Sequence, residues 1–218
     1  TGSRVIVCVP QNSLADGHIS FRPEIPAPQR EAMGKIRMGN ACKILIKLSK
    51  AVWPKGFWDC VCSDSFIPEI WVTPAASILS GEGTSGEHIV VGFVAGKRSD
   101  RLRKLSEEKR KRLFLSQLDA MFGTQQEPNP ASKAFVDCII MDWGVDPLFR
   151  GAYSHPTIGG RDARALMSTP LKERVHFAGE AMNRNINPCI NGAMESATIA
   201  VSEVLESLGR PRKPAAKL

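Results

Sequence analysis

The sequence has few aromatic residues, a single tyrosine and no long apolar run. Aromatic residues make up 6% of the 218 residues, and Tyr153 is the only tyrosine. No apolar stretch approaches the roughly 20 residues that a helix needs to cross a bilayer, and the N-terminal stretch lacks the pattern of a signal peptide. The sequence therefore predicts no membrane partner.

The sequence also lacks a metal-ligand pattern. Its six cysteines are scattered, and Cys60 and Cys62 form a C-x-C without a second pair or a nearby histidine. Structural zinc sites need about four such ligands at defined spacings. We therefore expect no metal site, and we interpret the cysteines as free thiols in a reducing compartment.

The net charge of +7 is concentrated in residues 97–112 and 210–217. The first cluster is interleaved with Asp100, Glu107 and Glu108, which is typical of a solvated helix face. Because no nucleic-acid motif accompanies the charge, we do not expect nucleic acid as a partner.

Hydrophobic periodicity predicts alternating strands and helices. Ile44, Ile46 and Leu48 share one face of a strand and Lys43 lies on the other, whereas the continuous apolar run at 5–10 is typical of a buried strand. Ser106 is expected to cap a long helix that ends at Gly123. The remaining strands are expected at 69–73, 89–95, 135–141 and 175–177, and the remaining helices at 28–36, ended by Gly39, and at 191–208.

One glycine-rich stretch matches the residue pattern of a nucleotide-binding fingerprint but not its expected structural context. Residues 81–86 (GEGTSG) read G-x-G-x-x-G, but they precede the strand-like run HIVVGFVA. The dinucleotide fingerprint must open a helix, whose N-terminus receives the pyrophosphate. We therefore interpret this stretch as a turn between strands.

The C-terminal segment combines features that suit a flavin. His176–Glu180 places an acid after a strand end and a small-residue turn, and Cys189–Ala193 opens a helix. Gly179 permits a close backbone approach. A helix N-terminus offers free N–H groups and a partial positive charge, which would stabilise the anionic edge of a reduced flavin. Taken alone, the pattern also fits an acid in a turn before an ordinary helix.

Four motifs, in order along residues 5–205, resemble those of the flavin amine oxidases, which include polyamine oxidases and lysine-specific histone demethylases. Residues 177–197 (FAGEAMNRNINPCINGAMESA) resemble the family's flavin-binding signature. Residues 143–154 (WGVDPLFRGAYS) resemble its W-x-x-D-P motif, residues 38–43 (MGNACK) its G-N-L-N-K motif, and residues 5–26 its VIVTVP…F-P-P-L-P segment.

The resemblance implies an α/β mixed fold, corresponding to the C-terminal half of a two-domain FAD-dependent amine oxidase. A mixed-sheet substrate domain with helices on one side is expected at 13–140. Residues 1–12 and 141–209 are expected to belong to the FAD-binding domain, and residues 210–218 to a basic flexible tail. The N-terminal FAD-binding half, with the glycine-rich phosphate loop, would come from the same or a separate chain.

The resemblance also assigns roles near the flavin. Lys43 matches the lysine that holds a water at flavin N5, and Tyr153 matches an aromatic residue beside the substrate amine. Trp143 matches a tryptophan that packs against the isoalloxazine. Lys43 and Tyr153 are therefore the expected catalytic residues, and Trp143 an expected cofactor-binding residue.

The remaining cofactor-binding residues implied by the resemblance are Ala152, Gly179, Glu180, Cys189, Ile190 and Ala193. Ala152 occupies the position where monoamine oxidases carry the cysteine that bonds the flavin, so FAD is expected to bind noncovalently. Cys189 stands where those enzymes have a cage tyrosine, Ile186 replaces a common tyrosine, and Leu148 replaces an aromatic residue. The amine pocket is therefore expected to be less aromatic than is usual in the family.

The implied reaction is oxidation of an amine or polyamine to an imine, with oxygen reduced to hydrogen peroxide. The reduced aromatic cage leaves open an alternative, in which the chain belongs to a catalytically degenerate scaffold or interaction subunit. The C-terminal Ala-Lys-Leu at 216–218 resembles the peroxisomal signal Ser-Lys-Leu, so a peroxisomal location is expected.

Overall fold

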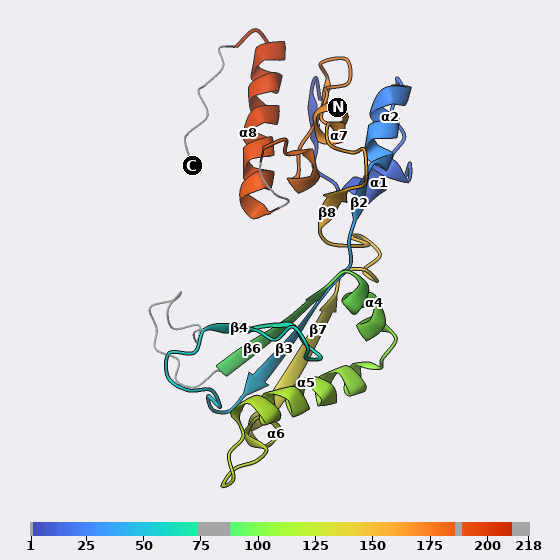
Figure 1. Ribbon diagram of the computed structural model, residues 1–218. Coiled ribbons are helices and arrows are strands. Elements are labelled where there is room, and N and C mark those ends of the chain that lie inside the picture. Colours follow the sequence, from blue (N-terminus) through green and yellow to red (C-terminus); the bar gives the residue numbers. More distant parts are fainter. Residues whose placement is uncertain (1, 74–87, 186–188, 211–218) are drawn as a thin grey trace. The chain divides into compact units, whose positions relative to one another are not determined.

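The structure is a computed structural model, which describes residues 2–73, 88–185 and 189–210. The chain divides into two compact units, Thr1–Gly39 with Asp146–Leu218 and Asn40–Val145. Each unit is described by itself (Figure 1). The glycine-rich stretch at 81–86, Ile186 and the Ala-Lys-Leu at 216–218 lie outside the described residues.

The unit Asn40–Val145 is built on a five-stranded sheet with the strand order β4-β5-β6-β3-β7. Every strand pairing described in this sheet is antiparallel, so the expected mixed sheet is wrong in this respect. Antiparallel pairing lets strands be joined by short connections, without crossover helices. The strands are β3 (Ala41–Leu48), β4 (Asp59–Val61), β5 (Glu69–Thr73), β6 (His88–Ala95) and β7 (Phe135–Asp142).

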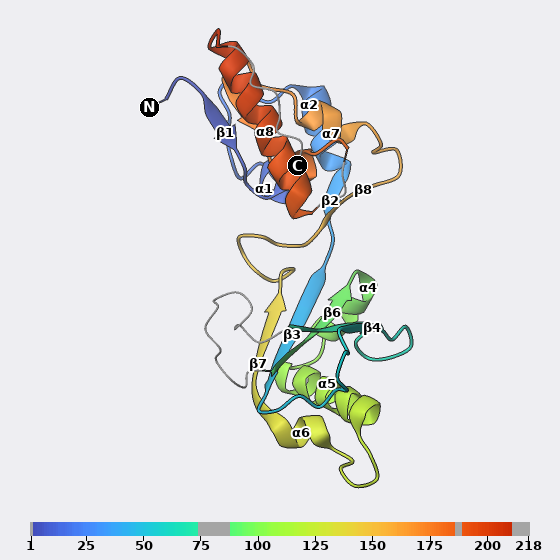
Figure 2. The same cartoon turned by 90° about the vertical axis from the view of Figure 1, so that its left-hand side faces the viewer.

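One face of this sheet packs into a hydrophobic core, as the alternation in β3 predicts. Ile44, Ile46 and Leu48 are completely buried. They pack with Phe114 and Leu118 of helix α5 (Glu107–Phe122), which runs along this side of the sheet (Figure 1). Burying each such side chain contributes about 1.5–3 kcal/mol. The shorter helices α4 (Lys97–Arg103) and α6 (Pro130–Ala134) belong to the same unit (Figure 2).

Helix α5 begins and ends where the sequence predicts. The Ser106 hydroxyl accepts a hydrogen bond from the Lys109 N–H at 3.3 Å, and Gly123 is the C-cap. The Asp119 carboxylate accepts hydrogen bonds from the N–H groups of Ala131 and Ser132 at 2.7 and 3.1 Å. This buried carboxylate therefore caps α6 and ties it to α5.

The basic segment 97–112 is only partly the solvated face that its composition suggests. Arg110 is 7% exposed and donates hydrogen bonds to the carbonyl oxygens of Leu105 and Arg103. Its guanidinium also lies 3.6 Å from the buried Asp142 carboxylate, which accepts two hydrogen bonds from Arg103. A cation that looks exposed in the sequence thus belongs to a buried ion-pair network.

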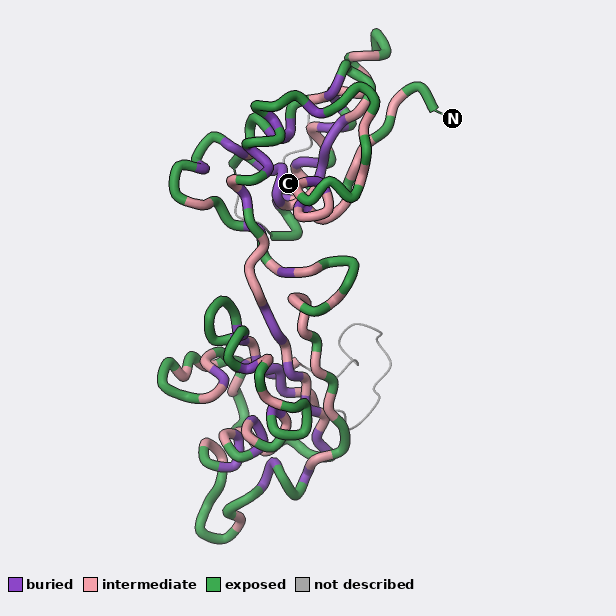
Figure 3. The backbone as a smooth tube through the Cα atoms, turned by 90° about the vertical axis from the view of Figure 1, so that its right-hand side faces the viewer, coloured by how far each residue is buried: buried purple, intermediate pink, exposed green. Residues whose placement is uncertain are grey.

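The unit Thr1–Gly39 with Asp146–Leu218 contains two small sheets and a core of its own. The buried residues are purple in Figure 3. Strand β1 (Val5–Val7) pairs in parallel with β9 (Val175–Phe177), and β2 (Ile36–Met38) pairs antiparallel with β8 (Ser154–Pro156). Segments far apart in the sequence therefore build both sheets. The helices are α1 (Gln11–Ala15), α2 (Ala27–Gly34), α7 (Ala163–Met167), the 3₁₀ helix η1 (Glu180–Met182) and α8 (Ile190–Ser207).

Two local expectations for this unit are wrong. Strand β1 is half-exposed rather than buried, with Val5 at 50% exposure, because β9 is its one paired neighbour among the described residues. Helix α2 ends at Gly34 instead of continuing through Ile36. Ile36 pairs with Pro156 of β8, so long-range strand pairing overrides the local helical pattern.

The boundaries between the two compact units differ from the expected domain boundaries. Residues 13–39 pack within the unit that contains β1 and β9, and residues 141–145 pack with the five-stranded sheet. The α/β mixed fold class itself is confirmed. Which unit serves the cofactor and which the substrate stays a prediction.

Candidate functional site

In the unit Asn40–Val145, Lys43 lies on the sheet face opposite the core. It is paired with Phe93 of β6 and Met141 of β7. Its ammonium nitrogen Nζ lies 5.3 Å from the centroid of the Trp71 ring and 5.7 Å from that of Trp143. Both distances are within the range of cation–π attraction. The two indoles therefore hold the lysine head group at a defined place on this face.

The surface around Lys43 is largely apolar. Leu45 follows on the same face of β3, and Ile139 and Met141 of β7 are 56% and 45% exposed. The Trp71 and Phe93 rings contact each other at a centroid distance of 6.1 Å. A cation in such surroundings interacts more strongly with a nearby polar group than it would in bulk water.

Trp143 is positioned by the turn that ends β7. Its N–H donates to the Ala41 carbonyl oxygen at 3.2 Å, and the Gly144 N–H donates to the Asp142 carboxylate at 3.2 Å. A Cβ added at Gly144 would lie 1.8 Å from the Arg103 guanidinium. The buried ion-pair network and the tryptophan therefore share one turn. The sequence predicts a role for Trp143 but gives no signal that Trp71 joins it.

In the other unit, the segment Gly151–Tyr153 is bound to Gly39. The Ala152 N–H donates to the Gly39 carbonyl oxygen at 2.8 Å, and the Gly39 N–H donates to the Tyr153 carbonyl oxygen at 2.8 Å. Gly151 has a φ of 145°, and an added Cβ would lie 2.7 Å from the Gly39 oxygen. A glycine is required at 151 for this approach, which leaves the Tyr153 side chain 50% exposed.

Glu180 belongs to a polar cluster that the sequence does not reveal. Its carboxylate accepts a hydrogen bond from the Ser154 hydroxyl at 2.6 Å. Arg164 donates to the Glu180 carbonyl oxygen at 3.1 Å and to the Ser154 hydroxyl at 3.0 Å. Burial lowers the pKa of the Arg164 guanidinium, and the Glu180 charge acts in the opposite direction. Ser154 and Arg164 therefore fix the position of the carboxylate.

The turn before Glu180 is tied to helix α8 through Ser196. The Gly179 N–H donates to the Ser196 hydroxyl at 2.9 Å, and this hydroxyl lies 2.9 Å from the Gly179 carbonyl oxygen. Gly179 has a φ of 134°, and no atom lies within 4 Å of the position of an added Cβ. The backbone at Gly179 therefore faces open space in a conformation that L residues rarely adopt.

The N-terminus of α8 is accessible. Cys189 is its N-cap and Ile190 its first residue; Cys189 is exposed, and Ile190 is 82% exposed. Ala193 is half-buried. No side chain of the described residues caps this terminus, and no acid lies in its first turn. Its first N–H groups, unpaired within the helix, therefore remain suited to an anionic partner.

These residues fit a flavin. One Glu180 oxygen is held by Ser154, and the other accepts no hydrogen bond from the described part of the chain, so it can accept one from a ribityl hydroxyl. Gly179 provides the open space, and the α8 N-terminus provides the donors. Of the sequence-predicted residues, Gly179 and Glu180 share one turn, Cys189, Ile190 and Ala193 share one helix start, and Ala152 and Tyr153 share one segment.

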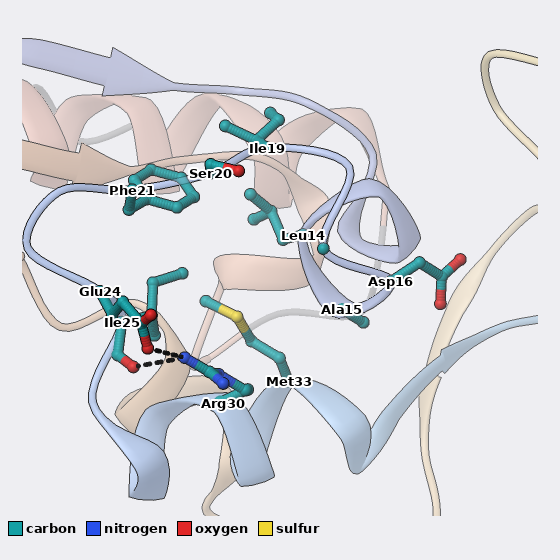
Figure 4. Close-up of a pocket in the computed structure, with 11 residues that line it drawn as sticks. Leu14, Ala15, Asp16, Ile19, Ser20, Phe21, Glu24, Ile25, Arg30 and Met33 are labelled. Atoms are coloured by element: carbon teal, nitrogen blue, oxygen red, sulfur yellow. Dashed lines mark hydrogen bonds and ion pairs between the residues drawn. The ribbon is translucent and has the colours of Figure 1, made fainter.

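A separate cavity of about 310 Å³ lies beside α1 and α2 (Figure 4). Leu14, Phe21 and Met33 line it, and an ion pair of 3.1 Å between Arg30 and Glu24 lies at its edge. None of the sequence-predicted site residues lines this cavity, so we do not assign it to the flavin.

Within residues 2–73, 88–185 and 189–210, no three metal-binding side chains lie close enough together to hold an ion. In the same residues, no helix combines the length and apolarity of a membrane span.

Comparisons with known proteins match these features. A family model described as flavin containing amine oxidoreductase matches residues 1–205. Lysine-specific histone demethylase 1 homolog 1 of Oryza sativa subsp. japonica is 28% identical over 218 residues, covering 97% of this chain and 24% of that protein. Probable polyamine oxidase 4 of Arabidopsis thaliana is 28% identical over 191 residues, covering 87% of this chain and 35% of that protein.

Solved structures share the fold. A putrescine oxidase double mutant, from a structure-based redesign of cofactor binding, superposes with a TM-score of 0.76 at 21% identity, over 96% of this chain and 43% of that chain. This chain thus spans less than half the length of these relatives.

Proposed function

Because the chain belongs to the family of flavin containing amine oxidoreductases, we propose that it is part of an enzyme that oxidises an amine with noncovalently bound FAD. The proposed products are an imine and, after reoxidation by oxygen, hydrogen peroxide. The proposal concerns the complete protein, because the relatives are more than twice as long as this chain.

When bound, FAD would supply the hydride-accepting chemistry, and the residues of this chain would bind and orient it. The Glu180 oxygen that no described residue occupies would accept a hydrogen bond from a ribityl hydroxyl, while Ser154 and Arg164 hold Glu180 in place. The first N–H groups of α8 would stabilise negative charge on the ring system. Ala152 has no sulfur with which to form a covalent bond to the flavin.

The arrangement of Lys43 is the observation that carries the proposal. Its ammonium group lies over two indole rings on a largely apolar sheet face. A lysine held in this way can position a water molecule by donating a hydrogen bond to it. We propose that Lys43 acts in this way during flavin reduction or reoxidation.

The proposed substrate is a small amine or a polyamine. Tyr153 presents an aromatic side chain at 50% exposure, anchored through its own backbone to Gly39. An aromatic face attracts a cationic amine and also packs against the neutral form that is oxidised.

The test compares Lys43→Met with Lys47→Met in the complete protein. Lys47 lies on the same face of β3, four residues away, and serves as the matched control. Stopped-flow absorbance would follow flavin reduction by amine and reoxidation by oxygen. We expect Lys43→Met to slow at least one half-reaction by about tenfold to a thousandfold while FAD stays bound.

Unchanged rates for both half-reactions in Lys43→Met would reject the assigned role. An absence of flavin absorbance from the complete protein would favour the scaffold alternative.

We also propose that an N-terminal FAD-binding half completes the cofactor site and that the enzyme is peroxisomal. Fusing residues 207–218 to a fluorescent protein tests the location, and a diffuse cytosolic signal would remove that claim.

A further inference from the structure

Cys60 of the edge strand β4 and Cys62, which directly follows this strand, bring their sulfur atoms together. The two Sγ atoms lie 3.5 Å apart, and both residues are half-buried against the hydrophobic core. Cys60 pairs with the buried Ile70 of β5, so its side chain points to the core side of the sheet. No other thiol pair is in contact within the described part of the chain.

The backbone keeps the two thiols in this arrangement. The Cys62 N–H donates to the Pro68 carbonyl oxygen at 2.7 Å, and the Cys62 carbonyl oxygen accepts from the Ser65 N–H at 3.0 Å. Cys60 is held in register by β5. Cys60 and Cys62 are two residues apart, about 6.6 Å along an extended strand, which is near the upper limit of the Cα separation in a disulfide. The bond therefore requires the edge segment to bend as well as the two side chains to rotate.

This pair lacks the further ligands of a metal centre. Zinc usually requires four ligands, and no group of three metal-binding residues occurs among the residues that the structure describes. Asp59 lies next to Cys60 on β4 but opposite Trp71, on the other face of the sheet. The chemistry available to the pair is therefore that of a dithiol.

We propose that Cys60 and Cys62 form a dithiol that peroxide oxidises to an intramolecular disulfide. The Cys62 thiolate attacks one peroxide oxygen, the O–O bond breaks, and the departing hydroxide takes up a proton to become water. The Cys60 sulfur then attacks the sulfenic acid at Cys62, and the S–O bond breaks to release a second water. Two thiols and one hydrogen peroxide thus give one disulfide and two waters.

The surroundings of the two sulfurs indicate which of them reacts with peroxide first. Burial, together with the hydrogen bond and charge of Cys62 and the charge of Asp59, raises the pKa of the Cys60 thiol to about 11. Cys60 is therefore protonated near neutral pH and is a poor first nucleophile. Its sulfur is nevertheless within contact distance of any sulfenic acid that forms at Cys62.

The dithiol and Lys43 lie on opposite faces of the sheet, and β4 is separated from β3 by β5 and β6. The oxidation itself does not depend on the proposed amine oxidase activity, because peroxide can be added from outside.

The test uses the complete protein, reduced and freed of reductant, and then treated with a small excess of hydrogen peroxide. Free thiols are blocked with N-ethylmaleimide, and the tryptic peptide 56–97, which contains both cysteines, is analysed by mass spectrometry. We expect this peptide to lose two hydrogen atoms, to carry no maleimide and to regain two reactive thiols after dithiothreitol.

Matched variants separate the pair from the other thiols. In Cys60→Ser and in Cys62→Ser, the peptide should no longer lose two hydrogens. In Cys138→Ser, which removes a half-buried thiol whose pKa burial also raises to about 11, peptide 56–97 should still form its disulfide. Alkylation of both thiols after peroxide treatment of the unmodified protein would overturn the proposal. So would a stable sulfinic acid on one cysteine with the other cysteine still free.

Discussion

Replacing Asp142 by asparagine should destabilise the protein by about 3 kcal/mol. The Asp142 side chain is 6% exposed and pairs with Arg103 at 2.9 Å and with Arg110 at 3.6 Å. Removing one partner of a buried ion pair costs about 3–5 kcal/mol, because the remaining charge stays buried without compensation. We expect the lower end of this range, because the Arg103 side chain is 29% exposed and can turn to water.

Thermal unfolding followed by circular dichroism measures this change. For a chain of this size, 1 kcal/mol shifts the Tm by about 2–4 °C, so Asp142→Asn should lower it by about 6–12 °C. Asp137→Asn is the matched control, because Asp137 is exposed on the same strand, and it should change the Tm by less than about 2 °C. A Tm for Asp142→Asn equal to that of the control would refute the buried-network reasoning.

Three further predictions follow from packing and from the flavin assignment. Gly92→Ala should destabilise the protein by about 1–3 kcal/mol in urea unfolding, because the new Cβ would lie 2.8 Å from the Phe114 ring and 2.9 Å from Ile67. Acid precipitation of the complete protein should release all of its FAD, because Ala152 cannot bond the flavin; flavin retained on the denatured polypeptide would contradict this. Titrating the 218-residue chain with FAD should show weak or no binding, because its one G-x-G-x-x-G match precedes a strand, and submicromolar affinity would disprove this expectation.

Local sequence rules locate most of the helices and strands. Ser106 and Gly123 mark the ends of α5, and the strand at 69–73 is found with the bounds predicted. These rules succeed where a segment's own chemistry decides its conformation. They fail at Ile36, where pairing with β8 ends the helix early, and at Val5, where strand neighbours rather than composition set the exposure.

The resemblance identifies the family, but it does not reveal which side chains meet. Ser154 and Arg164 hold Glu180, and neither is signalled by spacing, because 26 residues separate Ser154 from Glu180. Arg110 looks like a surface cation in a basic segment, yet it is buried beside Asp142. Contacts of this kind depend on how distant segments pack.

Side-chain alternation along β3 is enough to predict that Lys43 faces away from the core, because Ile44 and Ile46 occupy the other face. Folding, in contrast, brings Lys43 over two tryptophan rings and brings two cysteine sulfurs into contact. Trp71 and Trp143 belong to separate segments. Strand register brings Trp71 of β5 to Lys43, and the turn that ends β7 brings Trp143 to it. Periodicity within one segment fixes the direction of a side chain, whereas its neighbours depend on hydrogen-bonded registers between segments.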